Sequence, residues 1–291
     1  MPELPEVETT VNGLKLKVLK RTFIDVWSDW EKIVKKPKDF NQFKKEIKGK
    51  KINKIWRRAK NVIIDLSDNY SILIHQKMTG HLLVGKWENK DNIWKPTDTG
   101  PLNDPYNRFL HVIFFLNDGL MIALSDARKF AKVELWKTDE LLSSNEFKKI
   151  GPEPLEESFT FERFKEILKN KKGRIKQVIM NPEIIAGIGN IYASEALWQA
   201  KIHPEKNVLQ LNEKELKSLY QAIKKVLGLA VELGGESFSD YRKPDGSKGD
   251  FDTERNAYKR ERQKCRRCGD LIKRIKFAGR SAFYCPTCQK L

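Results

Sequence analysis

The sequence predicts an α+β protein with a β-rich N-terminal domain, a helical second domain and a small cysteine-bearing C-terminal module. Three features of the 291-residue chain indicate this architecture. Short apolar segments of strand length, separated by polar turns, fill residues 62–136. Apolar residues recur at helical spacing through much of residues 161–233. The four cysteines all lie in the last 27 residues.

The first element is expected to be a helix. Pro5 suits a first helical turn, because the N–H that proline lacks would have no partner there. Val7, Val11, Leu14 and Val18 follow at helical spacing and form one apolar face.

Short strands are expected after this helix. Polar sequences such as Ser-Asp-Asn and Asn-Asp-Gly separate them, which favours an antiparallel sandwich or barrel. The predicted strands cover residues 62–66, 71–75, 109–116, 120–124 and 133–136.

The chain then becomes helical. Helices are expected over residues 161–169, 191–199 and 213–233, and Gly234-Gly235 ends the last of them. The polar stretch from Glu236 to Thr253 predicts a mobile loop. We expect an N-terminal domain at 1–136, a linker at 137–152, a helical domain at 153–254 and a terminal module at 255–291.

The charge of the chain points to a polyanionic partner. The formal net charge is +17, and residues 255–291 hold twelve Lys or Arg against two acidic residues. DNA, RNA and an acidic membrane surface remain open on charge alone. No apolar run approaches the roughly 18 residues of a spanning helix, and the acidic start MPELPE is unlike a signal peptide. A cytoplasmic location is therefore expected.

The cysteines have the spacing of a metal site. Cys265 and Cys268 form one C-x2-C pair, Cys285 and Cys288 form another, and sixteen residues separate the pairs. Two such pairs complete a tetrahedral set of four thiolates with no open position, which predicts one structural zinc ion. Four free cysteines in a terminal tail is the alternative. Four basic residues between the pairs suggest a β-hairpin that contacts phosphate.

The N-terminus carries the most specific feature of the sequence. Residues 1–9 (MPELPEVET) resemble the N-terminal signature of the formamidopyrimidine-DNA glycosylase family. Removal of Met1 would make Pro2 a secondary amine, which can attack the sugar C1′ and form an iminium that has no N–H to lose. The resemblance implies that Pro2 is the nucleophile, that Glu3 is the general acid, and that Glu6 holds the site in register. A helix start rich in proline and acids is the other interpretation.

The resemblance continues along nearly the whole chain. The segment 56–60 (WRRAK) implies a functional Lys60 near the flipped nucleotide. The segments 75–80 (HQKMTG) and 126–130 (DARKF) imply that Met78, Arg128 and Phe130 fill the gap left by an extruded base. Met78 and Phe130 could otherwise be core residues. His75 is implied as a further DNA contact.

The second half of the chain adds expected phosphate contacts. Residues 187–193 (GIGNIYA) resemble the family's helix–two-turns–helix element, where Asn190 binds a phosphate, caps a helix starting at Ile191, or does both. Residues 278–285 (AGRSAFYC) resemble the zinc hairpin, whose Arg280 contacts phosphate and assists elimination. The remaining expected DNA contacts are His111, Lys172, Tyr258 and Arg260.

The sequence also departs from the family pattern. Gln76-Lys77 replaces a usual Leu-Gly, Ala127 and Ala131 replace a proline and a glycine, and Lys259 stands where glycine is usual. These changes leave the opposite-base preference open.

Taken together, the residues and the resemblance imply a bifunctional DNA glycosylase and AP lyase of base excision repair. It would remove 8-oxoguanine and formamidopyrimidines and cut the strand by β,δ-elimination, acting as a monomer on double-stranded DNA bound between its domains. A loop at Lys243–Phe251 would cover the flipped base. The alternatives are a zinc-bearing DNA-binding protein without catalysis, and a relative resembling endonuclease VIII that prefers oxidised pyrimidines.

Overall fold

The computed structural model describes residues 1–91, 93–237 and 240–291. Two compact units make up the chain. The first combines Met1–Lys148 with Leu233–Asp250, and the second combines Lys149–Glu232 with Phe251–Leu291. Leu233–Asp250 therefore clusters with the N-terminal unit, although its place in the sequence follows the helices of the second.

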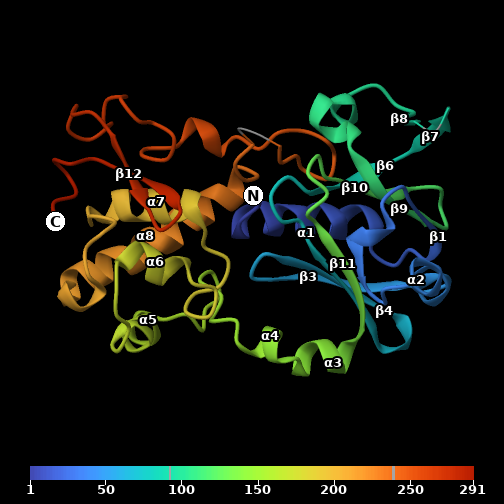
Figure 1. The fold of residues 1–291 in the computed structure, drawn as a ribbon, viewed down its shortest axis with the longest axis horizontal. Helices are drawn as coiled ribbons and strands as arrows, with labels where there is room; N and C mark the ends of the chain where they lie inside the picture. The colour runs from blue at the N-terminus through green and yellow to red at the C-terminus, as the bar shows by residue number, and fades with distance from the viewer. Residues whose placement is uncertain (92, 238–239) are drawn as a thin grey trace. The chain divides into compact units, whose positions relative to one another are not determined.

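The first unit contains two β-sheets (Figure 1). The four-stranded sheet has the order β1 (Phe23–Ser28), β9 (Leu110–Leu116), β10 (Met121–Ser125) and β6 (His81–Gly85). The five-stranded sheet has the order β2 (Val34–Lys36), β11 (Lys132–Lys137), β5 (Tyr70–His75), β4 (Asn61–Leu66) and β3 (Ile52–Arg58). A separate hairpin pairs β7 (Trp87–Lys90) with β8 (Ile93–Pro96).

One hydrophobic core joins the two sheets. It contains Phe114 and Leu124 from the first sheet, and Ile64 and Ile74 from the second. Helix α1 (Leu4–Val18) contributes its apolar face to the same core, and Figure 1 shows α1 in blue beside β3. The antiparallel sandwich predicted from sequence is confirmed, with one correction: β2 pairs with β11 in parallel.

The strand register brings several loops to one edge of the five-stranded sheet. His75, the last residue of β5, lies opposite Asn61 on one side and opposite Lys132 on the other. Asn61 follows the turn that contains Lys60, and Lys132 follows the loop 126–131. The loop 76–80 begins at the same point. These three connections therefore share one edge of the sheet.

The segment Leu233–Asp250 is packed in its described part. The side chains of Tyr241 and Arg242 are buried, and the N–H of Val84 donates to the carbonyl of Pro244 at 2.7 Å. The described residues of the segment 236–250 form no named helix or strand, as predicted for a loop, and they are packed within the first unit; the mobility of this loop stays a prediction. Residues 238 and 239 lie outside the described part of the chain.

The second unit is helical and ends in a hairpin. The longer helices of the second unit are α5 (Phe161–Leu168), α6 (Ile175–Met180), α7 (Asn190–Ala200) and α8 (Glu213–Glu232), and its hairpin pairs β12 (Lys273–Phe277) with β13 (Arg280–Tyr284). Helix α7 contacts both α8 and this hairpin.

Most elements predicted from sequence are confirmed to within one or two residues: the first helix, five strands, three helices and the terminal hairpin. The sequence analysis did not predict β1, β2, β3, β6, β7 and β8, or the short helices α2 (Phe40–Ile47), α3 (Thr138–Ser143), α4 (Asn145–Lys148) and α6. The sequence does not indicate β3 because only Ile52 and Ile55 along it are buried, so apolar and polar residues do not alternate regularly.

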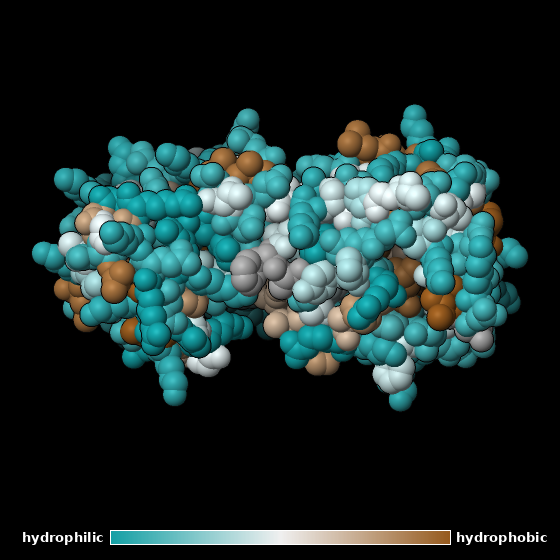
Figure 2. All heavy atoms as spheres, turned by 90° about the horizontal axis from the view of Figure 1, so that it is seen from above, coloured by the Kyte–Doolittle hydropathy of each residue, from teal (hydrophilic) through white to brown (hydrophobic). Residues whose placement is uncertain are grey.

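Hydrophilic residues cover most of the face shown in Figure 2. Met78 and Phe130 are large hydrophobic side chains that are exposed to solvent, at 41% and 51%. No described helix is long and apolar enough to cross a membrane.

Gln76 generates a prediction about stability. Its side chain is fully buried, and neither amide atom has a hydrogen-bond partner among the described residues. A buried unsatisfied polar group costs about 1–3 kcal/mol, so Gln76→Leu is expected to raise the free energy of unfolding by about 1–2 kcal/mol. Urea denaturation measures this change.

The matched control is Gln42→Leu, because Gln42 is exposed on α2. That control should leave the free energy of unfolding within about 0.5 kcal/mol of the native value. A Gln76→Leu variant that is less stable than the native protein would contradict this account.

Candidate functional site

Buried carboxylates surround the N-terminus. Pro2 is buried, Glu3 is the N-cap of α1, and both Glu3 and Glu6 are almost fully buried at 2% and 1% exposure. The N–H of Glu3 donates to Oε2 of Glu6 at 2.7 Å. Because ionisable carboxylates are rarely buried without partners, this arrangement indicates more than a frayed chain end.

The Glu6 carboxylate also holds a distant segment. Its Oε1 accepts the N–H of Glu236 at 2.7 Å, and the Glu6 carbonyl accepts the hydroxyl of Tyr241 at 2.9 Å. Gly235 has φ +81°, and a Cβ there would lie 2.8 Å from Glu6 Oε1. Only glycine suits both the backbone conformation and this close approach.

Lys60 lies in the turn of a hairpin that an ion pair joins to α1. It occupies the two-residue turn between β3 and β4 together with Ala59, which has φ +52°. Arg57, just before this turn, places its Nε 2.7 Å from Oε2 of Glu8 on α1. This ion pair ties the first helical turns to the hairpin that carries Lys60.

His75 is held neutral at the same sheet edge. Burial and the charges of Lys77, Lys132 and Lys60 lower the pKa of His75 to about 3. Its Nδ1 accepts the N–H of Lys77 at 3.0 Å, which leaves Nε2 as the protonated nitrogen.

Met78 and the loop 126–131 belong to one polar network. The buried Asp126 carboxylate accepts the hydroxyl of Thr79, the residue after Met78, and the N–H of Ala131 at 2.7 Å. The N–H of Arg128 donates to the Thr79 hydroxyl at 3.1 Å. The two loops that carry Met78, Arg128 and Phe130 are thus fixed to each other.

The exposed tips of these loops are apolar and cationic. The Arg128 guanidinium lies 4.6 Å from the centroid of the exposed Phe130 ring. An exposed cation–aromatic pair beside an exposed methionine suits contact with the flat faces and edges of bases. His111, by contrast, is buried and its Nδ1 lies 2.7 Å from Asp29 Oδ1.

In the second unit, Asn190 and Arg280 line one cavity of about 420 Å³. Arg280 is exposed and follows the tight turn Ala278-Gly279, where both residues have positive φ. The Oδ1 of Asn190 is buried without a hydrogen-bond partner among the described residues. The helix-capping role expected for Asn190 is wrong: α7 begins at Asn190 itself, and Gly189 is the N-cap.

Two of the remaining predicted contacts, Tyr258 and Arg260, lie in the terminal module. Glu195 is a buried carboxylate that accepts the N–H groups of Asn256, Ala257 and Tyr258 at 2.7–2.9 Å. Burial raises its pKa against these three hydrogen bonds. The guanidinium of Arg260 donates to Gln263 Oε1 at 2.9 Å and to nearby carbonyls, whereas Lys172 is exposed.

The four cysteines fit a zinc ion. Their sulfur atoms all lie within 4.8 Å of one another, and none forms a disulfide. Four Zn–S bonds of about 2.3 Å require sulfurs about 3.8 Å apart, so small adjustments complete the site. The indole N–H of Trp198 donates to Cys265 Sγ at 3.4 Å. Burial raises the pKa of Cys265, but N–H donors from Arg267, Cys268 and Trp198 outweigh it and lower this pKa to about 6.

Three residues that hold the site in place were not predicted from sequence. Asp126, Glu195 and Tyr241 are all buried and bind backbone or hydroxyl groups. An acid at the end of an apolar strand, such as Asp126 after β10, is the one local signal that could have been used. The Tyr241–Glu6 contact joins residues 235 positions apart, and no local signal in the sequence predicts it.

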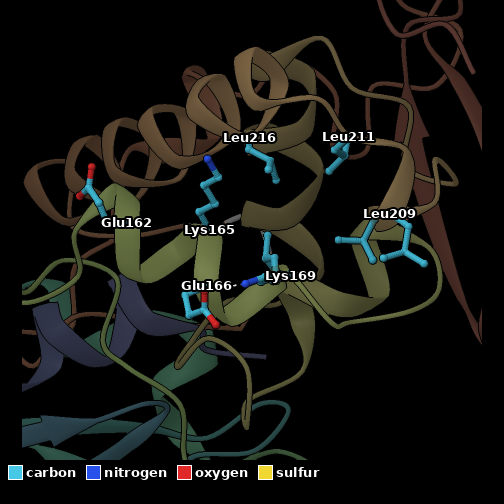
Figure 3. Close-up of a pocket in the computed structure, with 9 residues that line it drawn as sticks. Glu162, Lys165, Glu166, Lys169, Leu209, Leu211 and Leu216 are labelled. Carbon is cyan, nitrogen blue, oxygen red and sulfur yellow. Dashed lines mark ion pairs between the residues drawn. The ribbon is translucent and has the colours of Figure 1, made fainter.

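A second cavity, of about 340 Å³, lies between α5 and the segment 208–216 (Figure 3). Leu209, Leu211 and Leu216 line it, and Figure 3 shows Lys165 of α5 and Lys169, which follows α5, beside them. Its lining, as far as the chain is described, includes none of the predicted site residues.

The chain matches sequence models of three protein domains. Residues 1–133 match the formamidopyrimidine-DNA glycosylase N-terminal domain, and residues 150–242 match the H2TH domain of the same family. Residues 262–291 match the zinc finger found in FPG and IleRS.

Curated relatives match over their full lengths. A formamidopyrimidine-DNA glycosylase of Pelotomaculum thermopropionicum is 39% identical over 293 residues, covering 100% of both chains. One of Lactococcus lactis subsp. cremoris is 36% identical over 291 residues, again covering 100% of both.

Solved structures show the same similarity. Wild-type Lactococcus lactis Fpg (MutM) bound to DNA containing N7-benzyl-Fapy-dG superposes with a TM-score of 0.86 at 34% identity, covering 100% of both chains. MutM bound to DNA containing carbocyclic 8-oxo-G gives a TM-score of 0.85 at 36% identity, with 100% of both chains covered.

The buried histidine of β6 predicts a pH dependence of stability. Burial lowers the pKa of His81 to about 4, against an ordinary value of 6.5. The unfolded chain therefore takes up a proton below pH 6.5 that the folded chain resists, and stability is lost as the pH falls from 6.5 towards 4. Between pH 7 and pH 5 this group alone should remove roughly 2 kcal/mol. Urea denaturation at both pH values measures the loss.

His81→Gln keeps a side-chain N–H donor but cannot titrate. The variant should lose about 1–2 kcal/mol less than the native protein between pH 7 and pH 5. An identical loss in both proteins would show that His81 does not titrate as described.

Removal of zinc is expected to destabilise the second unit. After chelation no ion links the four cysteines, and the binding free energy of zinc no longer stabilises the fold. The apparent melting temperature should therefore fall by several degrees or more. Differential scanning fluorimetry measures the shift, and metal analysis of the native protein should find one zinc per chain. A protein that melts identically with and without metal would contradict a structural role.

Proposed function

The chain belongs to the formamidopyrimidine-DNA glycosylase family, and from that membership we propose that it excises oxidised purines from DNA and then cuts the strand. The substrates proposed are formamidopyrimidines and 8-oxoguanine in double-stranded DNA, as in the DNA bound by its structural relatives. The proposed location is the cytoplasm, at the nucleoid.

The observation that carries this proposal is the buried N-terminal cluster. Pro2, Glu3 and Glu6 are buried together, and the Glu6 carboxylate accepts the backbone N–H groups of Glu3 and Glu236. This fixes the position of the Pro2 backbone. A fixed, partly desolvated amine beside an acid is what attack on a sugar carbon needs.

The reaction begins with removal of Met1, which frees the Pro2 nitrogen as a secondary amine. Its lone pair attacks C1′ as the C1′–base bond breaks, and the departing base takes up the proton that the Pro2 nitrogen loses. Glu3 then protonates the ring oxygen O4′, the C1′–O4′ bond breaks, and the nitrogen lone pair forms the iminium. The product is a ring-opened sugar joined to Pro2 through an iminium.

The iminium then drives both strand cuts. Loss of a proton from C2′ expels the 3′ phosphate, and a second elimination expels the 5′ phosphate. The positive charge on nitrogen accepts electron density in each step, and water finally releases the sugar remnant. Lys60, at the same sheet edge, is proposed to steady the charge of the adjacent phosphate.

The exposed loop tips support base extrusion. Met78, Arg128 and Phe130 are proposed to enter the space that the flipped base leaves, which offsets part of the few kcal/mol that unstacking costs. The network of Asp126 and Thr79 supports this role because it holds the two loops together.

Phosphate contacts are proposed for both units. Asn190 and Arg280 share a cavity, into which the Asn190 side-chain NH2 group and the Arg280 guanidinium can donate hydrogen bonds to a phosphate. Zinc would hold the hairpin that presents Arg280. The further proposed contacts are His75, His111, Lys172, Tyr258 and Arg260.

Borohydride trapping tests the proposal. With an 8-oxoguanine·cytosine duplex, the native protein should form a reduced covalent adduct, and Pro2→Gly should reduce the yield on the order of a hundredfold. Glu3→Gln should slow adduct formation on the intact lesion by a similar factor. Gel electrophoresis of labelled DNA measures each yield.

Pro5→Ala is the matched control, because Pro5 is a second buried proline in the same turn. It should keep an adduct yield within about threefold of native. If correctly processed native protein forms no adduct with either oxidised or abasic DNA, the catalytic proposal is wrong.

A further inference from the structure

We infer that Asn107 is a positioning residue that holds the loop 241–249 in the conformation needed to receive a flipped base. The inference rests on the proposed function, because the loop 241–249 overlaps the segment Lys243–Phe251 that is expected to cover that base. It extends the site to the segment Pro101–Arg108, which precedes β9 and forms the short helices η3 (Pro101–Asn103) and η4 (Pro105–Arg108).

The loop lies directly against this segment. Gly246 has φ +87°, and a Cβ added there would lie 2.7 Å from backbone atoms of Pro101 and Leu102. On another side of the loop, a Cβ on Gly13 of α1 would lie 2.7 Å from the Pro244 ring. Backbone packing this close leaves room for only one arrangement of the loop on its support.

Asn107 makes the polar link across this contact. Its side chain is buried, at 2% exposure, and its Nδ2 donates to the carbonyls of Gly246 at 3.2 Å and Pro101 at 2.9 Å. Its Oδ1 lies 2.9 Å from Nε2 of the buried His81. Because both ends of the amide are used, its orientation is fixed and the loop carbonyl is held against β6.

Arg242 strengthens the same contact from the loop side. Its guanidinium is buried, its Nε lies 3.0 Å from Oδ2 of Asp104, and it packs 4.7 Å from the Tyr106 ring centroid. Asp104 also accepts the N–H of Tyr106 at 2.9 Å and so caps η4. The loop is therefore fastened at residue 242, at Pro244 and at Gly246.

Base excision and strand cleavage depend on this loop to different extents. Excision needs a damaged base to be received, whereas cleavage at a preformed abasic site involves no base. A change that loosens the loop alone should slow excision and spare abasic cleavage. A general loss of folding would slow both.

The experiment compares Asn107→Ala and Asn107→Asp with the native protein on two duplexes, one with 8-oxoguanine and one with an abasic site. Asn107→Asp is isosteric and can still accept from His81, but it cannot donate to the Gly246 carbonyl. Both variants lose the hydrogen bonds from Nδ2 to the Gly246 and Pro101 carbonyls, and this loss should slow single-turnover base excision about tenfold. Cleavage of the abasic duplex should stay within about twofold of native.

The matched control is Asn103→Ala. Asn103 is exposed in the same segment, and its amide donates only to Asp98 and Gly100 carbonyls in the described contacts. Both rates of this variant should equal those of the native protein. Should Asn107→Ala fail to fold, the isosteric variant carries the test.

Equal slowing on both duplexes, or unchanged excision in Asn107→Asp, would overturn the inference and leave the proposed function standing. Failure of the native protein to cleave the abasic duplex would instead refute the proposed function. The native abasic reaction therefore separates the two failures.

Discussion

The buried carboxylate of Glu6 is the constraint on which the rest of the first unit's site depends. It accepts backbone N–H groups from Glu3, three residues earlier, and from Glu236, far along the chain. A buried charge is tolerated only when such donors surround it. Meeting that requirement fixes the start of α1 and brings Leu233–Asp250 back to the N-terminal unit.

A second constraint is the register of the five-stranded sheet. Because β5 lies between β4 and β11, the turn with Lys60 and the two loops with Met78 and Phe130 share one edge. The Asp126–Thr79 hydrogen bond then joins the two loops. The rigid strands of the sheet therefore hold these loops in place, so that their exposed side chains are also well positioned.

Much of this could be predicted from sequence. The apolar period of α1, the strand-length runs and the paired cysteines depend on neighbours a few residues apart, and the corresponding elements are confirmed. The helix–two-turns–helix element and the roles of Pro2 and Glu3 came from resemblance to a family. Contacts between distant parts of the chain could be predicted neither from local sequence pattern nor from the family resemblance. The return of Tyr241 to Glu6, and the link from His81 through Asn107 to Gly246, depend on tertiary packing that local pattern does not encode.

The central claim is that the nitrogen of Pro2 becomes covalently joined to the DNA sugar. Mass spectrometry of peptides from the borohydride-reduced adduct tests it most directly, since it locates the bond on the chain. The account predicts a peptide that begins at Pro2 and carries the added sugar remnant on its terminal nitrogen. An adduct on Lys60 or another lysine, with the N-terminal peptide unmodified, would contradict it.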